Sequence, residues 1–358
     1  MSPAAFEAAA FSAASAGWRM PAEFEPHAAT WMAWPCRESL WGESFEAVKA
    51  DYARLASAIA RFEPLIMVAP AHLADEARRL CGCAVHVLPM PIDDSWARDS
   101  GPTFLVDDAG GLLATAFTFN AWGGKYHPHD EDARLAARIG AHLQAPVQSS
   151  PLVFEGGAIL SDGEGTLLTT ETCLLHPNRN PGMSRSEVEA ELRRMLGARC
   201  VIWLPGDPTE DETNGHIDGL LSLSAPGHAL LESIEDTADE RHRILAENRR
   251  ALELATDARG RRFEILSIEE APRETSVGSR YCRSYVNFYP CNGAVMAPAY
   301  GVPADARVKK LLGRAFPDRE IVMLPIGAIA IGGGGFHCIT QQQPAAVPRK
   351  ASAPTRTT

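Results

Sequence analysis

The chain has 358 residues, of which 46% are hydrophobic and 22% are charged, a composition typical of a globular protein with one large domain or two small ones. Its formal net charge of −11 and its pI of about 5.5 argue against nucleic-acid binding, because contacts to phosphates require a basic surface. No apolar run is long enough to span a membrane, so we expect no membrane association.

Helical and strand patterns alternate along the chain. The first clear helix is predicted for residues 44–62, where apolar side chains recur at spacings of three and four. The other predicted helices cover residues 71–81, 131–143, 184–196, 236–255 and 303–316. The predicted strands cover residues 65–69, 84–88, 103–106, 112–119, 158–160, 166–170, 201–204, 217–223, 229–232, 263–266, 285–289, 294–297, 321–324 and 326–331.

This alternation predicts an α/β protein with one helix for every two or three short strands. The pattern recurs roughly every 50 to 60 residues, which indicates a structural repeat. No proline-, glycine- or serine-rich linker divides the chain, so we expect a single domain over residues 18–344. Residues 1–17 are expected to form a ragged N-terminus, and residues 345–358 a disordered tail.

Cysteine and histidine spacing gives no metal signature. The eight cysteines are scattered without a C-x-x-C pair, so we expect reduced thiols in a cytoplasmic protein. His127 and His129 fall in a polar stretch whose spacing matches no zinc motif, and we interpret that stretch as a loop.

Cys338 is the strongest candidate nucleophile because of its position. It follows a run of four glycines, residues 332–335, which in turn follows the predicted strand 326–331. Glycine lets the backbone turn tightly and approach a ligand, so we expect Gly335 to contact substrate. A lone intracellular cysteine is usually only a small buried hydrophobe, so the assignment depends on its neighbours. His337 is expected to face away from Cys338, because adjacent side chains alternate in an extended chain.

Two acidic stretches are candidate partners of this cysteine. One contains Trp96 and Asp99 within D-D-S-W-A-R-D-S-G, and the other places Glu155 directly before two glycines. A further candidate pair is His216 and Asp218, which would share one face of the predicted strand 217–223. Each stretch alone is also compatible with a solvated turn or a surface pair.

Together these residue types favour chemistry on a guanidinium group. Carboxylates accept paired, charge-assisted hydrogen bonds from a guanidinium. A thiolate can attack its carbon, while a histidine supplies the acid and base for ammonia and water. A protease is less apt, because a neutral amide needs no set of buried acids and unpaired buried carboxylates are costly.

The chain resembles the agmatine deiminase family within the guanidine-modifying enzymes. The resemblance runs from residue 20 to 344 and rests on ten ordered blocks: MPAEFEPHAATWMAWP, DDSWARDSGPTF, FNAWGGK, FEGGAI, TLLTTETCLL, RNP, ETNGHIDG, SYVNFYPCNGAV, PAYG and GGGGFHCITQQQP. It implies a five-bladed α/β propeller of pseudo-five-fold ββαβ repeats, and a homodimer. It also implies a small cationic guanidine substrate, which is hydrolysed to N-carbamoylputrescine and ammonia.

The resemblance assigns roles to the reacting groups. Cys338 would attack the guanidinium carbon and form a covalent thiouronium intermediate. His216 would protonate the departing ammonia and then activate water, with Glu155 positioning it. No metal or organic cofactor is implied. We expect Cys338 to be a neutral thiol in the free enzyme, because the surrounding acids raise its pKa.

Other residues would bind the substrate. Asp99 and Asp218 would hold the guanidinium nitrogens, and Trp96 would pack on the alkyl chain. Gly219 and the stretch 125–132 depart from the family pattern, and both could touch the far end of the substrate. Deimination of another guanidine, such as a peptidyl C-terminal arginine, therefore stays open, as do an amidinotransferase and a non-catalytic polyamine-binding protein.

Overall fold

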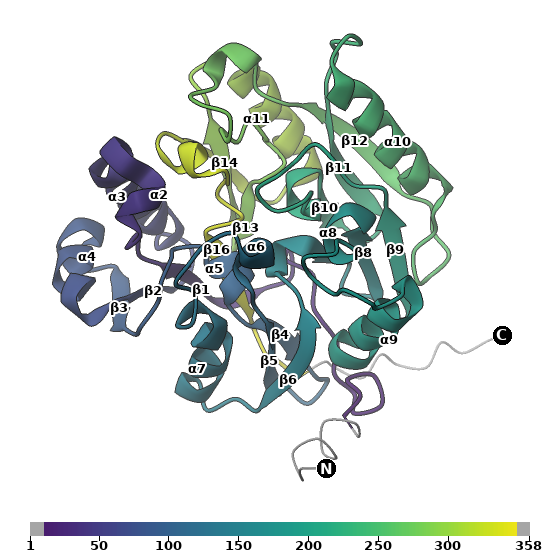
Figure 1. Ribbon diagram of the computed structural model, residues 1–358, viewed down its shortest axis with the longest axis horizontal. Coiled ribbons are helices and arrows are strands. Elements are labelled where there is room, and N and C mark those ends of the chain that lie inside the picture. The colour runs from purple at the N-terminus through teal and green to yellow at the C-terminus, as the bar shows by residue number, and fades with distance from the viewer. Residues whose placement is uncertain (1–10, 349–358) are drawn as a thin grey trace.

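The computed structural model describes residues 11–348, so parts of the expected N-terminal segment (1–10) and tail (349–358) lie outside the described residues. Within this range the chain forms small mixed sheets that are distributed around the middle of the molecule (Figure 1). No described helix is long and apolar enough to cross a membrane.

Four sheets repeat one unit. Two antiparallel strands are followed by a helix and by a third strand that pairs parallel to the second. In chain order the units are β4 (Thr103–Val106), β5 (Leu112–Thr118), α7 (Leu135–His142) and β6 (Val147–Val153); β7 (Ile159–Ser161), β8 (Thr166–Thr170), α9 (Arg185–Leu196) and β9 (Cys200–Leu204); β10 (Leu221–Ala225), β11 (His228–Ser233), α10 (Glu240–Leu254) and β12 (Glu264–Glu269); β13 (Tyr289–Cys291), β14 (Ala294–Ala299), α11 (Ala304–Ala315) and β15 (Glu320–Pro325).

The remaining sheet joins segments from both ends of the described chain, in the order β16-β1-β2-β3. Its elements are β1 (His27–Ala33), α3 (Phe45–Ile59), β2 (Leu65–Ala69), α4 (Ala74–Cys81), β3 (Val85–Pro89) and β16 (Thr340–Pro344). β16 pairs antiparallel to β1, with Trp31 opposite Gln341, and in Figure 1 the yellow β16 lies beside the purple β1. The repeat predicted from the sequence is thus present, although one unit is completed by a strand from the far end.

Short helical segments connect the sheets and carry polar residues toward the middle of the molecule. They are α2 (Glu38–Trp41), α5 (Ala97–Ser100), α6 (Ala121–Gly124) and α8 (Glu171–Leu174), with 3-10 turns at Gly42–Ser44, Ala71–Leu73, Asp132–Arg134, Gly156–Ala158, Ile217–Gly219, Arg273–Thr275 and Ile329–Gly332.

The long helices were predicted correctly in kind, and their ends shift by a few residues. α9 begins with a capping box, in which Ser184 and Glu187 exchange hydrogen bonds with each other's backbone. Three strand predictions were wrong: residues 326–331 form a turn and a 3-10 helix, the strand predicted from residue 217 begins only at Leu221, and the strand predicted for residues 285–289 begins only at Tyr289. Short apolar runs indicate burial but cannot separate a strand from a buried turn.

Apolar packing anchors these elements. The largest cluster lies around α3 and includes Trp34, Tyr52 and Met67, each fully buried. Full burial of one such side chain contributes roughly 1.5–3 kcal/mol. Part of the segment expected to be ragged packs on the protein: Ala13 is fully buried, and its amide donates to the carbonyl of Arg194 in α9 at 2.8 Å.

Candidate active site

The predicted site residues come together in one place, although four different segments supply them. Gly157, in the turn after β6, lies at their centre. A Cβ atom at this glycine would lie 2.6 Å from His216 Nδ1, 2.9 Å from Asp218 Oδ2 and 2.9 Å from Asp99 Oδ1. Only a residue without a side chain allows these three groups to approach so closely.

Cys338 lies in the turn between the 3-10 helix Ile329–Gly332 and β16. Its Sγ lies 3.5 Å from Asp218 Oδ2 and 3.4 Å from Asn287 Oδ1. Burial, together with the charges of Asp218 and Asp99, holds the pKa of the Cys338 thiol well above its ordinary value. The free site therefore favours the neutral thiol, as we predicted from the surrounding acids.

His216 and Asp218 face the site from one tight turn. His216 precedes the 3-10 helix Ile217–Gly219, which contains Asp218, so a helical turn and not strand alternation brings them to one side. Burial disfavours a charged ring, but the neighbouring groups, Asp99 first, then Cys173 and Glu155, hold the pKa of His216 well above its ordinary value. The surroundings of His216 therefore favour the protonated ring.

Glu155 is fully buried behind His216. Its Oε1 accepts a hydrogen bond from Arg179 Nε at 2.7 Å, and its Oε2 lies 3.5 Å from His216 Nε2. Burial alone would raise the pKa of Glu155, but His216 and Arg179 hold it below its ordinary value. Glu155 therefore presents a carboxylate to the histidine ring.

Asp99 is fixed by two donors. Trp122 Nε1 donates to its Oδ2 at 2.9 Å, and the Gly157 amide donates to its Oδ1 at 2.9 Å. Trp122 holds this position with a left-handed backbone, φ 55° and ψ 41°, which is costly for a bulky residue and common at functional sites.

Asp218 is fixed by His337, and here the sequence expectation was wrong. His337 Nδ1 lies 2.8 Å from Asp218 Oδ2, the oxygen that also contacts the Cys338 thiol. The His337 ring therefore faces the site and does not point away from it. Residues 337 and 338 belong to a turn, because β16 begins only at Thr340, and strand alternation does not apply there. The hydrogen bond from His337 holds the pKa of Asp218 below its ordinary value despite burial.

An aromatic pocket leads to Cys338. Trp96 stacks on Trp41, with ring centroids 5.7 Å apart and planes 28° apart, and lines this pocket together with Asp99, Trp122 and Tyr126. Because a Cβ at Gly334 would lie 2.4 Å from the Trp96 ring, the glycine run is needed for this packing.

Gly335 lies in the turn that holds Cys338, and its expected contact with substrate stays a prediction. A Cβ there would lie 2.4 Å from Asn287 Oδ1, so Gly335 packs on the asparagine that contacts Cys338. Gly333 and Gly334 line the aromatic pocket, and Gly335 lines neither this pocket nor the wider cavity beside it.

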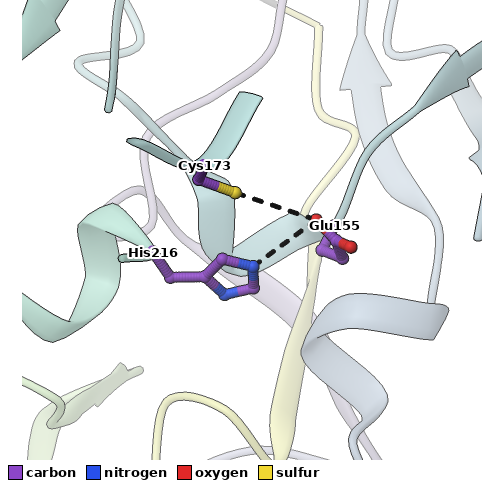
Figure 2. A group of neighbouring side chains, drawn as sticks. All are labelled: Glu155, Cys173 and His216. Atoms are coloured by element: carbon purple, nitrogen blue, oxygen red, sulfur yellow. Dashed lines mark hydrogen bonds and ion pairs between the residues drawn. The ribbon is translucent and has the colours of Figure 1, made fainter. Parts of the chain in front are cut away.

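Glu155, Cys173 and His216 form a buried group of potential metal-binding atoms, all within 4.8 Å of one another (Figure 2). Within residues 11–348 it is the one such group, so His127 and His129 of the interpreted loop are not part of any. The guanidinium of Arg179 is paired with Glu155, and its positive charge opposes a cation at this place.

Several contacting residues were not singled out from the sequence. Asn287, Trp122 and Arg179 lie within blocks that carry the resemblance (SYVNFY, FNAWGGK and RNP), but polarity and spacing alone did not mark them. Glu23 and Cys173 also lie within such blocks (MPAEFEPHAATWMAWP and TLLTTETCLL), but each reaches the site only through the tertiary structure.

Comparisons with known proteins identify the family of this chain. Residues 19–344 match the model of the Porphyromonas-type peptidyl-arginine deiminase family. An agmatine deiminase of Pseudomonas aeruginosa (strain LESB58) is 42% identical over 94% of this chain and 97% of that protein. One from Stutzerimonas stutzeri (strain A1501) is 41% identical over 92% and 96%.

A solved structure gives the same result. The agmatine deiminase of Enterococcus faecalis superposes with a TM-score of 0.90 at 32% identity, covering 94% of this chain and 98% of that one. Matches of this extent include every segment that contributes to the site. The chain therefore belongs to the Porphyromonas-type peptidyl-arginine deiminase family, and its curated relatives include agmatine deiminases.

Proposed function

We propose that this protein is a hydrolase of carbon–nitrogen bonds that converts agmatine to N-carbamoylputrescine and ammonia. One observation carries the proposal: the thiol of Cys338 lies 3.5 Å from the Asp218 carboxylate, at a site where Asp99, Asp218 and His216 all border Gly157. Two carboxylates can hold the nitrogens of a planar cation while its carbon faces the sulfur.

The first half of the reaction forms a carbon–sulfur bond. Binding of the guanidinium offsets the acids and favours loss of the Cys338 proton to solvent. The thiolate then attacks the guanidinium carbon, and protonated His216 gives its proton to one nitrogen, which leaves as ammonia. The product of this half is an S-alkylthiouronium on Cys338.

The second half breaks that bond. His216, now neutral, takes a proton from water, whose oxygen attacks the same carbon. The carbon–sulfur bond breaks and its electrons return to Cys338. The sulfur then takes the remaining hydroxyl proton, and the neutral substituted urea leaves. Glu155 holds the His216 ring in both halves.

The far end of the aromatic pocket supports an amine-tailed substrate. Glu212 lines this pocket with Trp96 and Cys338. Its Oε2 accepts a hydrogen bond from Tyr126 Oη at 2.7 Å, and its Oε1 lies 3.8 Å from Arg280 Nε. We infer that its carboxylate pairs with the primary ammonium of agmatine while the indole of Trp96 covers the alkyl chain.

A cavity of about 690 Å³ beside the site supports a second candidate. It reaches Cys338 and His216 and would admit a larger guanidine, such as the C-terminal arginine of a peptide. The narrow aromatic pocket that ends at Glu212 favours agmatine over that alternative.

The experiment is ammonia release and product mass from purified protein with agmatine, free arginine, an arginine-terminated peptide and guanidinobutyrate. A one-dalton gain on agmatine alone is expected. Turnover of the peptide alone would replace agmatine with the second candidate, and no turnover would overturn the deiminase. Ammonia release without an acceptor amine separates a deiminase from an amidinotransferase.

The assembly is also inferred. The five sheets and their shared unit support a five-bladed α/β propeller, with residues 18–344 as one catalytic domain.

All eight cysteines are free, which fits a reducing cytoplasm. We infer a homodimer, which sedimentation of the purified protein tests.

A further inference from the structure

Cys173 is a buried thiol that the proposed reaction does not use. It lies in α8, is fully buried, and donates from Sγ to Glu155 Oε2 over 3.9 Å. Figure 2 shows this contact beside the one between Glu155 and His216, so two side chains converge on a single carboxylate oxygen.

That oxygen is the one Glu155 has available for the histidine. Its other oxygen, Oε1, is occupied by Arg179 at 2.7 Å. The ring nitrogen that faces Glu155 Oε2, His216 Nε2, is buried and forms no hydrogen bond in the described structure. Glu155 Oε2 stabilises a proton on His216 Nε2. The strength of that stabilisation therefore depends on how strongly Cys173 binds the same oxygen.

We propose that Cys173 is a positioning residue for the Glu155–His216 pair: its thiol holds Glu155 Oε2 by a long, weak S–H bond and leaves most of that oxygen's charge to His216. A thiol is a weak donor, so it fixes the carboxylate without neutralising it. This inference rests on the proposed function, in which His216 must both give and take a proton.

The two ring nitrogens of His216 face different groups, and the proton affinity of the ring can be set on the Nε2 side. Nδ1 faces Asp99 Oδ1 at 3.8 Å and Asp218 Oδ1 at 4.0 Å, and both acids are needed for the guanidinium. Nε2 faces Glu155, whose carboxylate is contacted by Cys173 and Arg179, and the Cys173 thiol also lies within 4.8 Å of the His216 ring. The protein can therefore set the proton affinity of His216 at Nε2 without changing the carboxylates that bind substrate.

The test compares Cys173→Ala with Cys173→Ser. Alanine removes the donor, so more of the charge on Oε2 faces His216 and the ring holds its proton to higher pH. Serine donates a shorter and stronger hydrogen bond, which draws Oε2 away from the ring, so the ring loses its proton at lower pH. The basic limb of the kcat/KM profile should move up with alanine and down with serine, each by about half a pH unit.

A second measurement does not depend on turnover. The ¹³Cε1 signal of His216, assigned by its loss in His216→Asn, should titrate with the same opposite shifts in the two variants. If the wild type fails to turn over agmatine, the proposed function fails while this titration still tests Cys173.

The matched control is Cys291→Ala, which removes another fully buried thiol, in β13. It should lower stability without moving either titration. The proposal is overturned if both Cys173 variants, with native circular dichroism, titrate like the wild type or shift in the same direction. In that case Cys173 only fills space.

Discussion

His337 Nδ1 lies 2.8 Å from Asp218 Oδ2, the oxygen that also lies 3.5 Å from the Cys338 sulfur. The other ring nitrogen, Nε2, lies 2.8 Å from Glu23 Oε1. A buried histidine between two carboxylates holds both of them ionised, because its positive charge offsets theirs. His337, the residue next to Cys338, therefore helps to hold the Asp218 carboxylate in place.

Replacing His337 with asparagine should destabilise the protein by on the order of 3–5 kcal/mol at pH 6, because one member of a buried charge set is lost. The pKa of folded His337 is raised, since the pull of Glu23 and Asp218 exceeds the opposing effects of burial and Arg98. Its contribution is complete below the unfolded pKa of about 6.5 and is lost as pH rises through the folded value. Urea unfolding from pH 6 upward should show the wild type and variant converging, and a constant gap would contradict this.

Glu23 should give the opposite pH dependence. Although burial opposes it, Arg98 and His337 hold the pKa of Glu23 at about 2, compared with 4.5 for a free side chain. Its stabilisation is present above pH 4.5 and is lost as pH falls through about 2. Wild-type unfolding free energy should fall by about 3 kcal/mol more than that of Glu23→Gln between pH 6 and pH 2. Parallel curves would show that Glu23 is not the group responsible.

Alkylation of Cys338 in the free protein should be slow at pH 7, because burial and the nearby acids raise the pKa of its thiol. Peptide mass spectrometry after iodoacetamide can follow it against Cys83, an exposed thiol in the same chain. Saturating methylguanidinium should increase the rate at Cys338 and leave Cys83 unchanged. A fast reaction without the cation would show a preformed thiolate.

Gly157→Ala should reduce kcat/KM for agmatine by at least about a hundredfold, because the new methyl group pushes His216, Asp218 and Asp99 apart. Gly313→Ala, in α11, is the matched control, since a Cβ there meets only Ile321 at 3.9 Å, an ordinary van der Waals contact. The control should keep near wild-type rates and folding. An equal loss of kcat/KM in both variants would show that the close approach of the three groups at Gly157 is not the cause.

Glu212→Gln should raise the KM for agmatine about tenfold, equivalent to about 1.4 kcal/mol of lost binding. The charge that pairs with the ammonium is lost, whereas the hydrogen bond to Tyr126 can persist. Butylguanidine, which lacks the amine, should be turned over equally by both forms. A similar KM increase for both substrates would place Glu212 in a structural role.

The sequence predicted the elements well where a helix is long or a motif is chemically distinctive. The periodicity of residues 44–62 and the capping box at Ser184 each correspond to helices in the structure. The cysteine, the histidine and the three acids could be nominated because charged residues beside glycine in apolar surroundings are unusual.

The remaining contacts depend on long-range packing. Asp218 was placed correctly for the wrong reason, since a 3-10 turn replaces the expected strand. The orientation of His337 could not be predicted because it depends on where β16 begins. Glu23 and Cys173 lie far in sequence from their partners His337 and Glu155, at separations of 314 and 18 residues, and have no local pattern that would reveal them.

The pairing of β16 with β1 determines when the site can form during synthesis. The acids and His216 all leave the ribosome before Cys338, which directly precedes the strand that completes the first sheet. A growing chain that has not yet released residues 340–344 lacks the partner of β1 and has no fixed position for its nucleophile. On the proposed function, reactivity toward guanidines therefore arises only after residues 340–344 have been released and β16 has paired with β1.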